Sequence, residues 1–254
     1  MNKTYTITFG DVAENHARMQ KIGTLHEKGF TCEQLEELKQ KMESEGVECE
    51  IVNLSDKWIG EEEVDEATVL VIRKGVHHIL QCDSTEELMK EHDALQMDKK
   101  AKMRGKVVNK NARWNLCFDE ESQEPNYEEG KGRIVAYRDI PMTQKIRETV
   151  STWMKGEMLK GEANYYYDLK NCGIGYHGDG ERKKVFAMRM GCPMPIYFQW
   201  FQQSAPMGER IKIELNDGDM YAMSEKAVGF DWLKKKVATL RHAAGCDKFT
   251  VIKK

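Results

Sequence analysis

The feature that most restricts the fold is a succession of short strand-like segments in the C-terminal part of the chain. The segments are rich in β-branched and aromatic residues, and Gly and Pro residues separate them. So many short strands are typical of two β-sheets packed face to face. The predicted strands are Ala163–Leu169, Val185–Met190, Ile196–Phe201, Arg210–Leu215, Asp219–Met223 and Lys248–Ile252.

The N-terminal part instead alternates predicted strands and helices. Thr31 and Gln34 form a capping box for a helix that ends near Gly46. The other predicted elements are strands at Thr4–Phe9, Glu50–Leu54 and Thr68–Ile72, a helix from Asp11 to about Ile22 and a helix capped by Ser84. We therefore predict an α+β protein of two domains, a small acidic α/β module at residues 1–95 and a β-rich domain at residues 96–254.

The charge is distributed unevenly between these two parts. Residues 1–90 carry 10 Lys+Arg against 19 Asp+Glu, whereas residues 91–254 carry 29 against 23. The basic part is the candidate for contact with a polyanion, because cation–phosphate contacts supply most sequence-independent affinity for nucleic acid. We expect the acidic module to avoid nucleic acid and to be a candidate surface for another protein.

The sequence also predicts the cellular compartment and the oxidation state of the cysteines. No apolar run reaches the length of a membrane span, and the first residues lack the apolar segment of a signal peptide. The seven cysteines are scattered, without a Cys-x-x-Cys pair. We therefore expect an intracellular protein, cytoplasmic or nuclear, with reduced thiols and no membrane partner.

A His-x-Asp motif stands out among the polar residues. On an extended segment the side chains of His177 and Asp179 project from the same side. A second imidazole would complete a 2-His-1-carboxylate facial triad, which leaves three positions of an Fe(II) ion open. His242 is the candidate for that imidazole, and the alternative is a capping histidine after the basic run Lys234–Lys236.

Several further motifs occur in order around these residues. Asn164-Tyr165-Tyr166 precedes the His-x-Asp, Glu181 extends it to His-x-Asp-x-Glu, and Gly218–Met223 with His242 follow. In this order they resemble the AlkB-like Fe(II)- and 2-oxoglutarate-dependent dioxygenases, over about residues 97–254. The resemblance implies a double-stranded β-helix, or jelly roll, and oxidative demethylation of N-methylated bases in DNA or RNA, with Fe(II), 2-oxoglutarate and O2.

The resemblance also assigns roles to individual residues. It implies that His177, Asp179 and His242 bind the metal and that Glu181 contacts the target base, unless Glu181 is a surface residue. It implies a 2-oxoglutarate site on the predicted last strand, where lysines stand in place of the family's arginines. The residues for that site are Asn164, Tyr166, Lys248, Thr250 and Lys254.

A basic segment with an aromatic residue is the candidate for substrate binding. It resembles the segment that helps to form the nucleotide-recognition lid in repair members of the family. Cations beside an aromatic ring suit a surface that holds a phosphate backbone and stacks a base, although such an aromatic residue can also belong to the core. The candidate residues are Arg104, Lys106, Arg113 and Trp114.

Two other functions remain open from the sequence. The same iron centre would serve a hydroxylase of a protein side chain or of a small molecule. A catalytically silent binding module is the third alternative, and the intact triad argues against it. Neither the modified group nor the oligomeric state follows from the residues.

Overall fold

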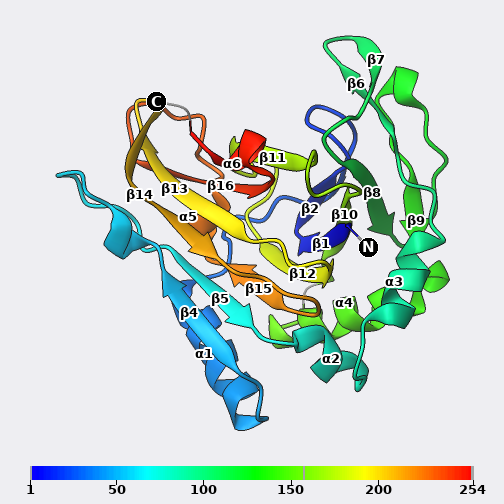
Figure 1. Ribbon diagram of the computed structural model, residues 1–254, viewed down its shortest axis with the longest axis horizontal. Helices are drawn as coiled ribbons and strands as arrows, with labels where there is room; N and C mark the ends of the chain where they lie inside the picture. The colour runs from blue at the N-terminus through cyan, green and yellow to red at the C-terminus, as the bar shows by residue number, and fades with distance from the viewer. Residues whose placement is uncertain (1, 157, 253–254) are drawn as a thin grey trace.

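The computed structural model describes residues 2–156 and 158–252, and the chain is an α+β protein dominated by antiparallel strands (Figure 1). Its strands form an eight-stranded sheet, a four-stranded sheet and two hairpins, and among the described residues no sheet closes into a barrel. The hairpins are β2–β3 (Val12–Glu14 and Lys21–Gly23) and β6–β7 (Lys100–Met103 and Lys106–Asn109).

The eight-stranded sheet forms the centre of the molecule. Its neighbours pair in antiparallel fashion, apart from the parallel pair at one edge, β8 and β9. The order across the sheet is β4 (Cys49–Asn53), β5 (Thr68–Ile72), β15 (Met220–Met223), β12 (Val185–Gly191), β1 (Thr4–Gly10), β10 (Lys160–Tyr166), β8 (Trp114–Asp119) and β9 (Ile134–Ala136).

Strand β1 lies between β10 and β12, so the N-terminus supplies a central strand. All seven of its residues are buried. Because side chains alternate across a strand, its threonines face one side of the sheet while Tyr5, Ile7 and Phe9 face the other. The apolar side joins the core beneath the helices, and the threonine side faces the four-stranded sheet.

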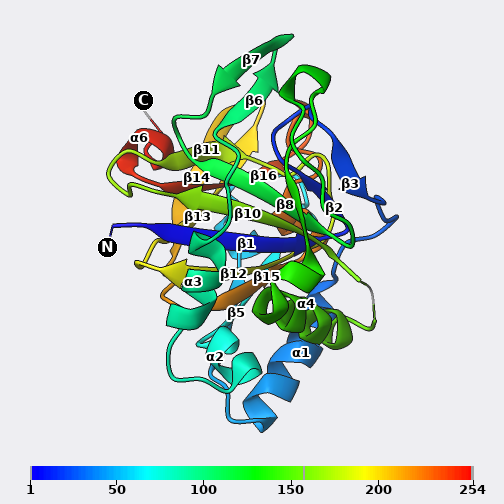
Figure 2. The ribbon, with the colours of Figure 1, turned by 90° about the vertical axis from the view of Figure 1, so that its right-hand side faces the viewer.

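Four helices cover the apolar side of the large sheet (Figures 1 and 2). They pack Leu35, Leu38, Ile146 and Val150 into one core with residues of β1 and β12. These helices are α1 (Cys32–Ser44), α2 (Gly75–Leu80), α3 (Glu86–Asp93) and α4 (Pro141–Trp153), and two shorter helices are α5 (Glu225–Val228) and α6 (Asp247–Thr250). Short 3-10 turns lie at Ser55–Lys57, Tyr127–Glu129 and Tyr137–Asp139.

The four-stranded sheet packs against the other side of the large sheet. A second core lies between the two sheets, with Val71 and Ala187 from the large sheet against Phe198, Trp200 and Leu240 from the small one. The large sheet is therefore buried on both faces. The order of the small sheet is β11 (Gly173–His177), β16 (Thr239–Gly245), β13 (Ile196–Gln202) and β14 (Ala205–Ile213).

Most predicted elements occur in the structure. The capping box of Thr31 and Gln34 is present at the start of α1, and Pro141 stands at the start of α4, where its fixed φ suits the first helical turn. Strands were predicted at β1, β4, β5, β10, β12, β13, β14 and β15. All eight are present, β5 with the predicted ends and the other seven with shifted ends. Strand β16 was not predicted, although it carries His242.

Two predicted elements are wrong. The helix expected from Asp11 to Ile22 is the β2–β3 hairpin, because the Asp11 carboxylate binds distant backbone amides and Arg18 adopts a positive φ of 72°. The strand expected at Lys248–Ile252 is helix α6. In the large sheet the strand that lies between β10 and β12 is β1.

The segment 1–95, which the sequence predicts as a separate module, contributes β1, β4 and β5 to the eight-stranded sheet. These strands are hydrogen-bonded to β10, β12 and β15 from the second half of the chain. The two predicted domains therefore share one sheet. No helix in the described ranges is long and apolar enough to cross a membrane, and all seven cysteines are free thiols.

Candidate metal centre and its cavity

Strands β11 and β16 bring the two candidate histidines together. His177 ends β11, His242 lies in β16, and the two residues are paired across the antiparallel ladder. Their imidazole rings are 4.4 Å apart between centroids, and the ring of Phe198 packs 5.9 Å from that of His242. The unpredicted strand β16 therefore places His242 beside the His-x-Asp motif.

Asp179 completes the cluster from the loop after β11. Its Oδ1 lies 3.5 Å from His177 Nε2 and 3.4 Å from His242 Nε2, and the three ligand atoms all lie within 4.8 Å of one another. Neighbouring ligands that each lie about 2.1 Å from a metal are roughly 3 Å apart in octahedral geometry. The observed spacing suits one divalent ion, so the structure brings together the three residues predicted as metal ligands.

Gly178 allows the loop to pass close to a second segment. A Cβ atom at this position would lie 2.0 Å from the carbonyl oxygen of Gly229, so a side chain cannot fit there. The backbone N–H of Asp179 donates to the carbonyl of Val228 at 3.0 Å. The end of α5 therefore holds the backbone between the two ligands of the motif.

Hydrogen bonding and burial leave His177 and Asp179 in ligand form. The Nδ1 atom of His177 lies 2.8 Å from the carbonyl of Gly175, which makes Nδ1 the donor and leaves Nε2 unprotonated. Burial, together with the nearby His242, lowers the pKa of His177 to about 3. Burial opposes the charge of Asp179, but His242, Arg182 and His177 hold the pKa of its carboxyl below the usual value.

Arg182 is a buried cation beside Glu181 for which the sequence predicts no role. Its Nη2 atom donates to the carboxylate of Glu162 and lies 2.8 Å from Glu181 Oε1, and its Nε lies 3.6 Å from Asp179 Oδ2. One guanidinium thus holds three acidic side chains, including a candidate ligand. Its spacing of three residues after Asp179 was the only sequence signal for this role.

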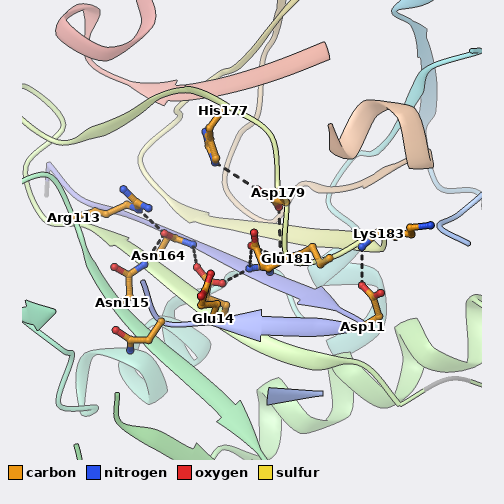
Figure 3. Close-up of polar contacts among 12 residues, drawn as sticks. Asp11, Glu14, Arg113, Asn115, Asn164, His177, Asp179, Glu181 and Lys183 are labelled. Carbon is orange, nitrogen blue, oxygen red and sulfur yellow. Dashed lines mark hydrogen bonds and ion pairs between the residues drawn. The ribbon is translucent and has the colours of Figure 1, made fainter. Parts of the chain in front are cut away.

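Asp11 anchors the other end of the ligand-bearing loop. Its Oδ1 accepts hydrogen bonds of 3.0 Å from the backbone amides of Lys183 and Lys184, and its Oδ2 accepts one from the amide of His26. Figure 3 shows the contact between Asp11 and Lys183 to the right of Glu181. The N-terminal segment therefore supports the candidate metal centre directly.

The three ligands line a cavity of about 640 Å³. Its opposite wall is the threonine side of the large sheet, and it includes Thr6, Asn164, Tyr166 and Arg189. Asn164 accepts hydrogen bonds from Arg113 Nε (2.6 Å) and from Asn115 (2.8 Å), as Figure 3 shows. Asn164 and Tyr166 thus lie on the cavity wall, as predicted for cofactor-binding residues.

Carboxylates gather on another part of the same wall, where Glu14, Glu162 and Glu181 line the cavity. Burial and the charge of nearby Glu181 raise the pKa of Glu14 to about 7. Burial also raises the pKa of Glu181. Glu181 is therefore a partly buried residue of the cavity wall and not the surface glutamate of the alternative interpretation.

One relative is similar to this chain over almost its whole length. A protein of Acanthamoeba polyphaga mimivirus, described as uncharacterized, is 46% identical over 253 residues, and the alignment covers 98% of each chain. This chain belongs to the family of that viral protein. The alignment extends over the N-terminal strands as well as the segment from His177 to His242. No model of a protein family matches the chain.

Of the C-terminal residues predicted for the 2-oxoglutarate site, the two that the structure describes, Lys248 and Thr250, do not line the cavity. Lys248 is exposed on α6, with its Nζ atom 5.4 Å from the ring of Phe249. Thr250 is buried, and its carbonyl accepts hydrogen bonds from Tyr176 and Arg210. Lys254 lies outside the described residues. The prediction for this segment is corrected because it assumed a strand where α6 forms.

The predicted substrate-binding residues are divided among three places. Arg113 lines the cavity. Arg104 and Lys106 are exposed at the tip of the β6–β7 hairpin, which projects beyond the large sheet (Figure 2). Trp114 pairs with Tyr165 on the opposite face of the sheet from Asn164, beside a second cavity of about 530 Å³. Trp114 therefore cannot stack a base that lies in the cavity of the metal centre.

Proposed function

We propose that this protein is an AlkB-like dioxygenase that uses Fe(II) and 2-oxoglutarate to demethylate N-methylated bases in nucleic acid. The observation that carries the proposal is the cluster of His177, Asp179 and His242 at one wall of a large cavity. Two imidazoles and one carboxylate on one face of a metal leave positions for an oxo-acid and dioxygen. The closed side of the cluster is the small sheet, and the open side faces the cavity.

The arrangement of the sheets supports a jelly-roll interpretation. Strands β15, β12, β1 and β10 lie opposite the four strands β11, β16, β13 and β14, with the candidate ligands between the two layers. In this interpretation β1 occupies the position in the large sheet that the strand expected after His242 would take. Because this position is already filled, the C-terminal segment forms α6 instead of a strand.

The residues present fit the chemistry of the proposed metal. Bound Fe(II) and 2-oxoglutarate would supply dioxygen activation, in which the oxo-acid becomes succinate and CO2 while a C–H bond of the substrate becomes C–OH. His177, Asp179 and His242 hold the metal on one side. Arg182 favours the ionised form of Asp179, and burial of the cluster limits the access of water. Hydroxylation of an N-methyl group yields a hemiaminal, which releases formaldehyde.

The carboxylates on one part of the cavity wall support a cationic or neutral target group. Glu14, Glu162 and Glu181 line the cavity, and adenine methylated at N1 or cytosine methylated at N3 carries a positive charge. The exposed cations Arg104 and Lys106 on the β6–β7 hairpin suit a phosphate backbone outside the cavity. A base must leave its stack to reach such a buried centre.

The same acidic wall also suits a methylated amine of a protein side chain or small molecule. Trp114, the aromatic residue predicted to stack a base, faces away from the cavity. The substrate is therefore distinguished by experiment, with formaldehyde release measured against methylated oligonucleotides, methyl-lysine peptides and small N-methyl amines.

The first prediction concerns the metal. His177→Ala and Asp179→Ala should each lose stoichiometric Fe(II) and 2-oxoglutarate turnover, because each removes one of three ligands. Metal content is measured by elemental analysis, and circular dichroism reports the fold. The matched control is His78→Ala, since His78 pairs with Glu45 away from the cluster. Full metal content in both ligand variants would refute the metal centre, and metal binding without oxo-acid turnover would favour the silent binding module.

The second prediction concerns the hairpin. The double variant Arg104→Ala, Lys106→Ala should bind single-stranded oligonucleotides more weakly, with a smaller salt dependence, because each lost phosphate contact removes roughly 0.7 to 0.9 from the slope of log K against log salt. Lys41→Ala with Lys145→Ala is the control, since both lysines are exposed on helices that cover the other side. Salt-independent binding by the wild type would favour the protein or small-molecule substrate.

A further inference from the structure

Arg189 is a buried cation without an anionic partner. It lies in β12, is 1% exposed and lines the cavity of the candidate metal centre. Its Nη1 atom donates to the hydroxyl of Thr6, but its Nε has no hydrogen-bond partner in the described part of the chain. No described carboxylate forms an ion pair with it. This guanidinium therefore has unused donor capacity at the cavity wall.

Two acidic residues of this region, Asp219 and Glu162, already interact with other groups. Asp219, whose charge acts on Arg189, accepts from Arg73 Nη1 at 2.8 Å and from the backbone amide of Lys74 at 3.0 Å. Glu162 pairs with Arg182. The two buried arginines of the cavity thus differ, because Arg182 forms ion pairs with carboxylates and Arg189 forms none with the described residues.

The charge of Arg189 is nevertheless retained. Burial lowers the pKa of its guanidinium, but arginine remains protonated in proteins at neutral pH because its usual pKa is above about 12. A buried charge without a counter-ion is strongly unfavourable. A negatively charged ligand in the cavity would remove that penalty.

The strand register places other polar groups beside the guanidinium. Thr6 is paired with Asn164 on one side and with Arg189 on the other, so the three side chains form a row across β10, β1 and β12. Tyr166 and Tyr221 are two further buried residues of the same wall. The row faces the cavity that His177, Asp179 and His242 line from the other side.

We propose that Arg189, supported by Thr6, binds the carboxylate of the oxo-acid that lies farthest from the metal. The inference rests on the proposed function and identifies the residue that takes the role predicted for the C-terminal lysines. A planar guanidinium matches a carboxylate with two parallel hydrogen bonds, and the Nε of Arg189 is a donor that the described residues leave unpartnered. A dicarboxylate such as 2-oxoglutarate then binds the metal at one end and Arg189 at the other.

The test compares two oxo-acids on the full-length protein loaded with Mn(II) without turnover. Pyruvate shares the metal-binding end of 2-oxoglutarate but lacks the distal carboxylate. Arg189→Gln should raise the calorimetric Kd for 2-oxoglutarate by roughly ten- to a hundredfold, the range expected for a hydrogen bond to a charged group. Its Kd for pyruvate and its metal content should match the wild type. Arg189→Lys, which keeps the charge without the fork, should give an intermediate Kd.

Lys248→Gln is the matched control, and it should bind 2-oxoglutarate like the wild type. The inference is overturned if Arg189→Gln and Arg189→Lys both retain wild-type affinity, or if Lys248→Gln causes the loss. Either outcome would leave the dioxygenase proposal standing, because the wild type would still bind metal and oxo-acid. A metal-loaded wild type that binds neither oxo-acid would overturn both proposals together.

Discussion

Each face of the eight-stranded sheet carries a buried side chain with an unpartnered nitrogen atom, and the consequences differ between the two faces. On the cavity face, Arg189 has an unpartnered Nε, and on the helix-covered face, His92 has an unpartnered Nδ1. Both side chains are buried, at 1% and 0% exposure. Strand β1 lies beneath both, since Thr6 contacts Arg189 and the ring of Tyr5 lies 5.6 Å from that of His92.

The difference between the two residues is the ability to lose a proton. His92 Nε2 donates to Thr143 Oγ1 at 2.8 Å, while that hydroxyl donates to Glu91. Burial lowers the pKa of His92 to about 4, so the ring is neutral at pH 7 and needs no counter-ion. An arginine cannot neutralise itself in this way. A buried nitrogen without a hydrogen-bond partner therefore suggests an anion-binding site only when its side chain stays charged and lines a cavity.

The largest effect expected from this comparison is an acid sensitivity caused by His92. In the unfolded chain the imidazole takes up a proton below its usual pKa of about 6.5, whereas in the folded protein it does so only near 4. The neutral ring therefore makes its full contribution to the free energy of unfolding above about pH 6.5, and this contribution is lost as the pH falls toward 4. Between pH 7 and pH 5 the loss is about 2 kcal/mol.

Urea unfolding of the wild type and of His92→Gln at pH 7 and pH 5 measures this loss. The variant removes the titrating ring, so its free energy of unfolding should fall less over the same interval. The difference between the two proteins isolates His92, because other buried groups such as His177 titrate in both. Equal pH dependence in the two proteins would show that the helix-covered face tolerates the charged ring.

Local patterns were sufficient for much of the fold. The capping box of Thr31 and Gln34 and the proline at position 141 act within one turn of helix, so the sequence predicts these helix starts directly. The alternation of Thr4–Phe9 predicts β1 for the same reason. The cluster of His177, Asp179 and His242 was also predicted, since facial-triad chemistry allows few residue types and the motif order indicated His242 as the third member.

Long-range pairing explains what the sequence did not predict. Lys248–Ile252 has an acceptable strand pattern, but β1 fills the place beside β10 and β12, and α6 forms instead. Asp11 was expected to cap a helix and instead binds amides more than 170 residues away. Arg189 carried no sequence signal, because its lack of an ion-pair partner among the described residues depends on which strands lie beside β12. Each of these outcomes depends on register between distant strands.

The smallest expected effect separates the two faces at adjacent residues of β1. Thr6 faces the cavity and accepts from Arg189, and Ile7 faces the helix-covered core at 0% exposure. Ile7→Val should lower the free energy of unfolding by about 0.5–1.5 kcal/mol, because it leaves a small void. It should not change the Kd for 2-oxoglutarate, since its side chain points away from the cavity.

Thr6→Val should have the opposite signature. Valine has nearly the shape of threonine but cannot accept from Arg189 Nη1, so the guanidinium is less well oriented for a carboxylate. The loss of one hydrogen bond to a charged group, partly offset by rearrangement of the guanidinium, should raise the Kd for 2-oxoglutarate by roughly three- to tenfold. The Kd for pyruvate should stay unchanged. Calorimetry and urea unfolding on both variants provide the comparison. If Ile7→Val weakens 2-oxoglutarate binding as much as Thr6→Val does, the two faces of β1 are coupled, and the separation of ligand site from core is incorrect.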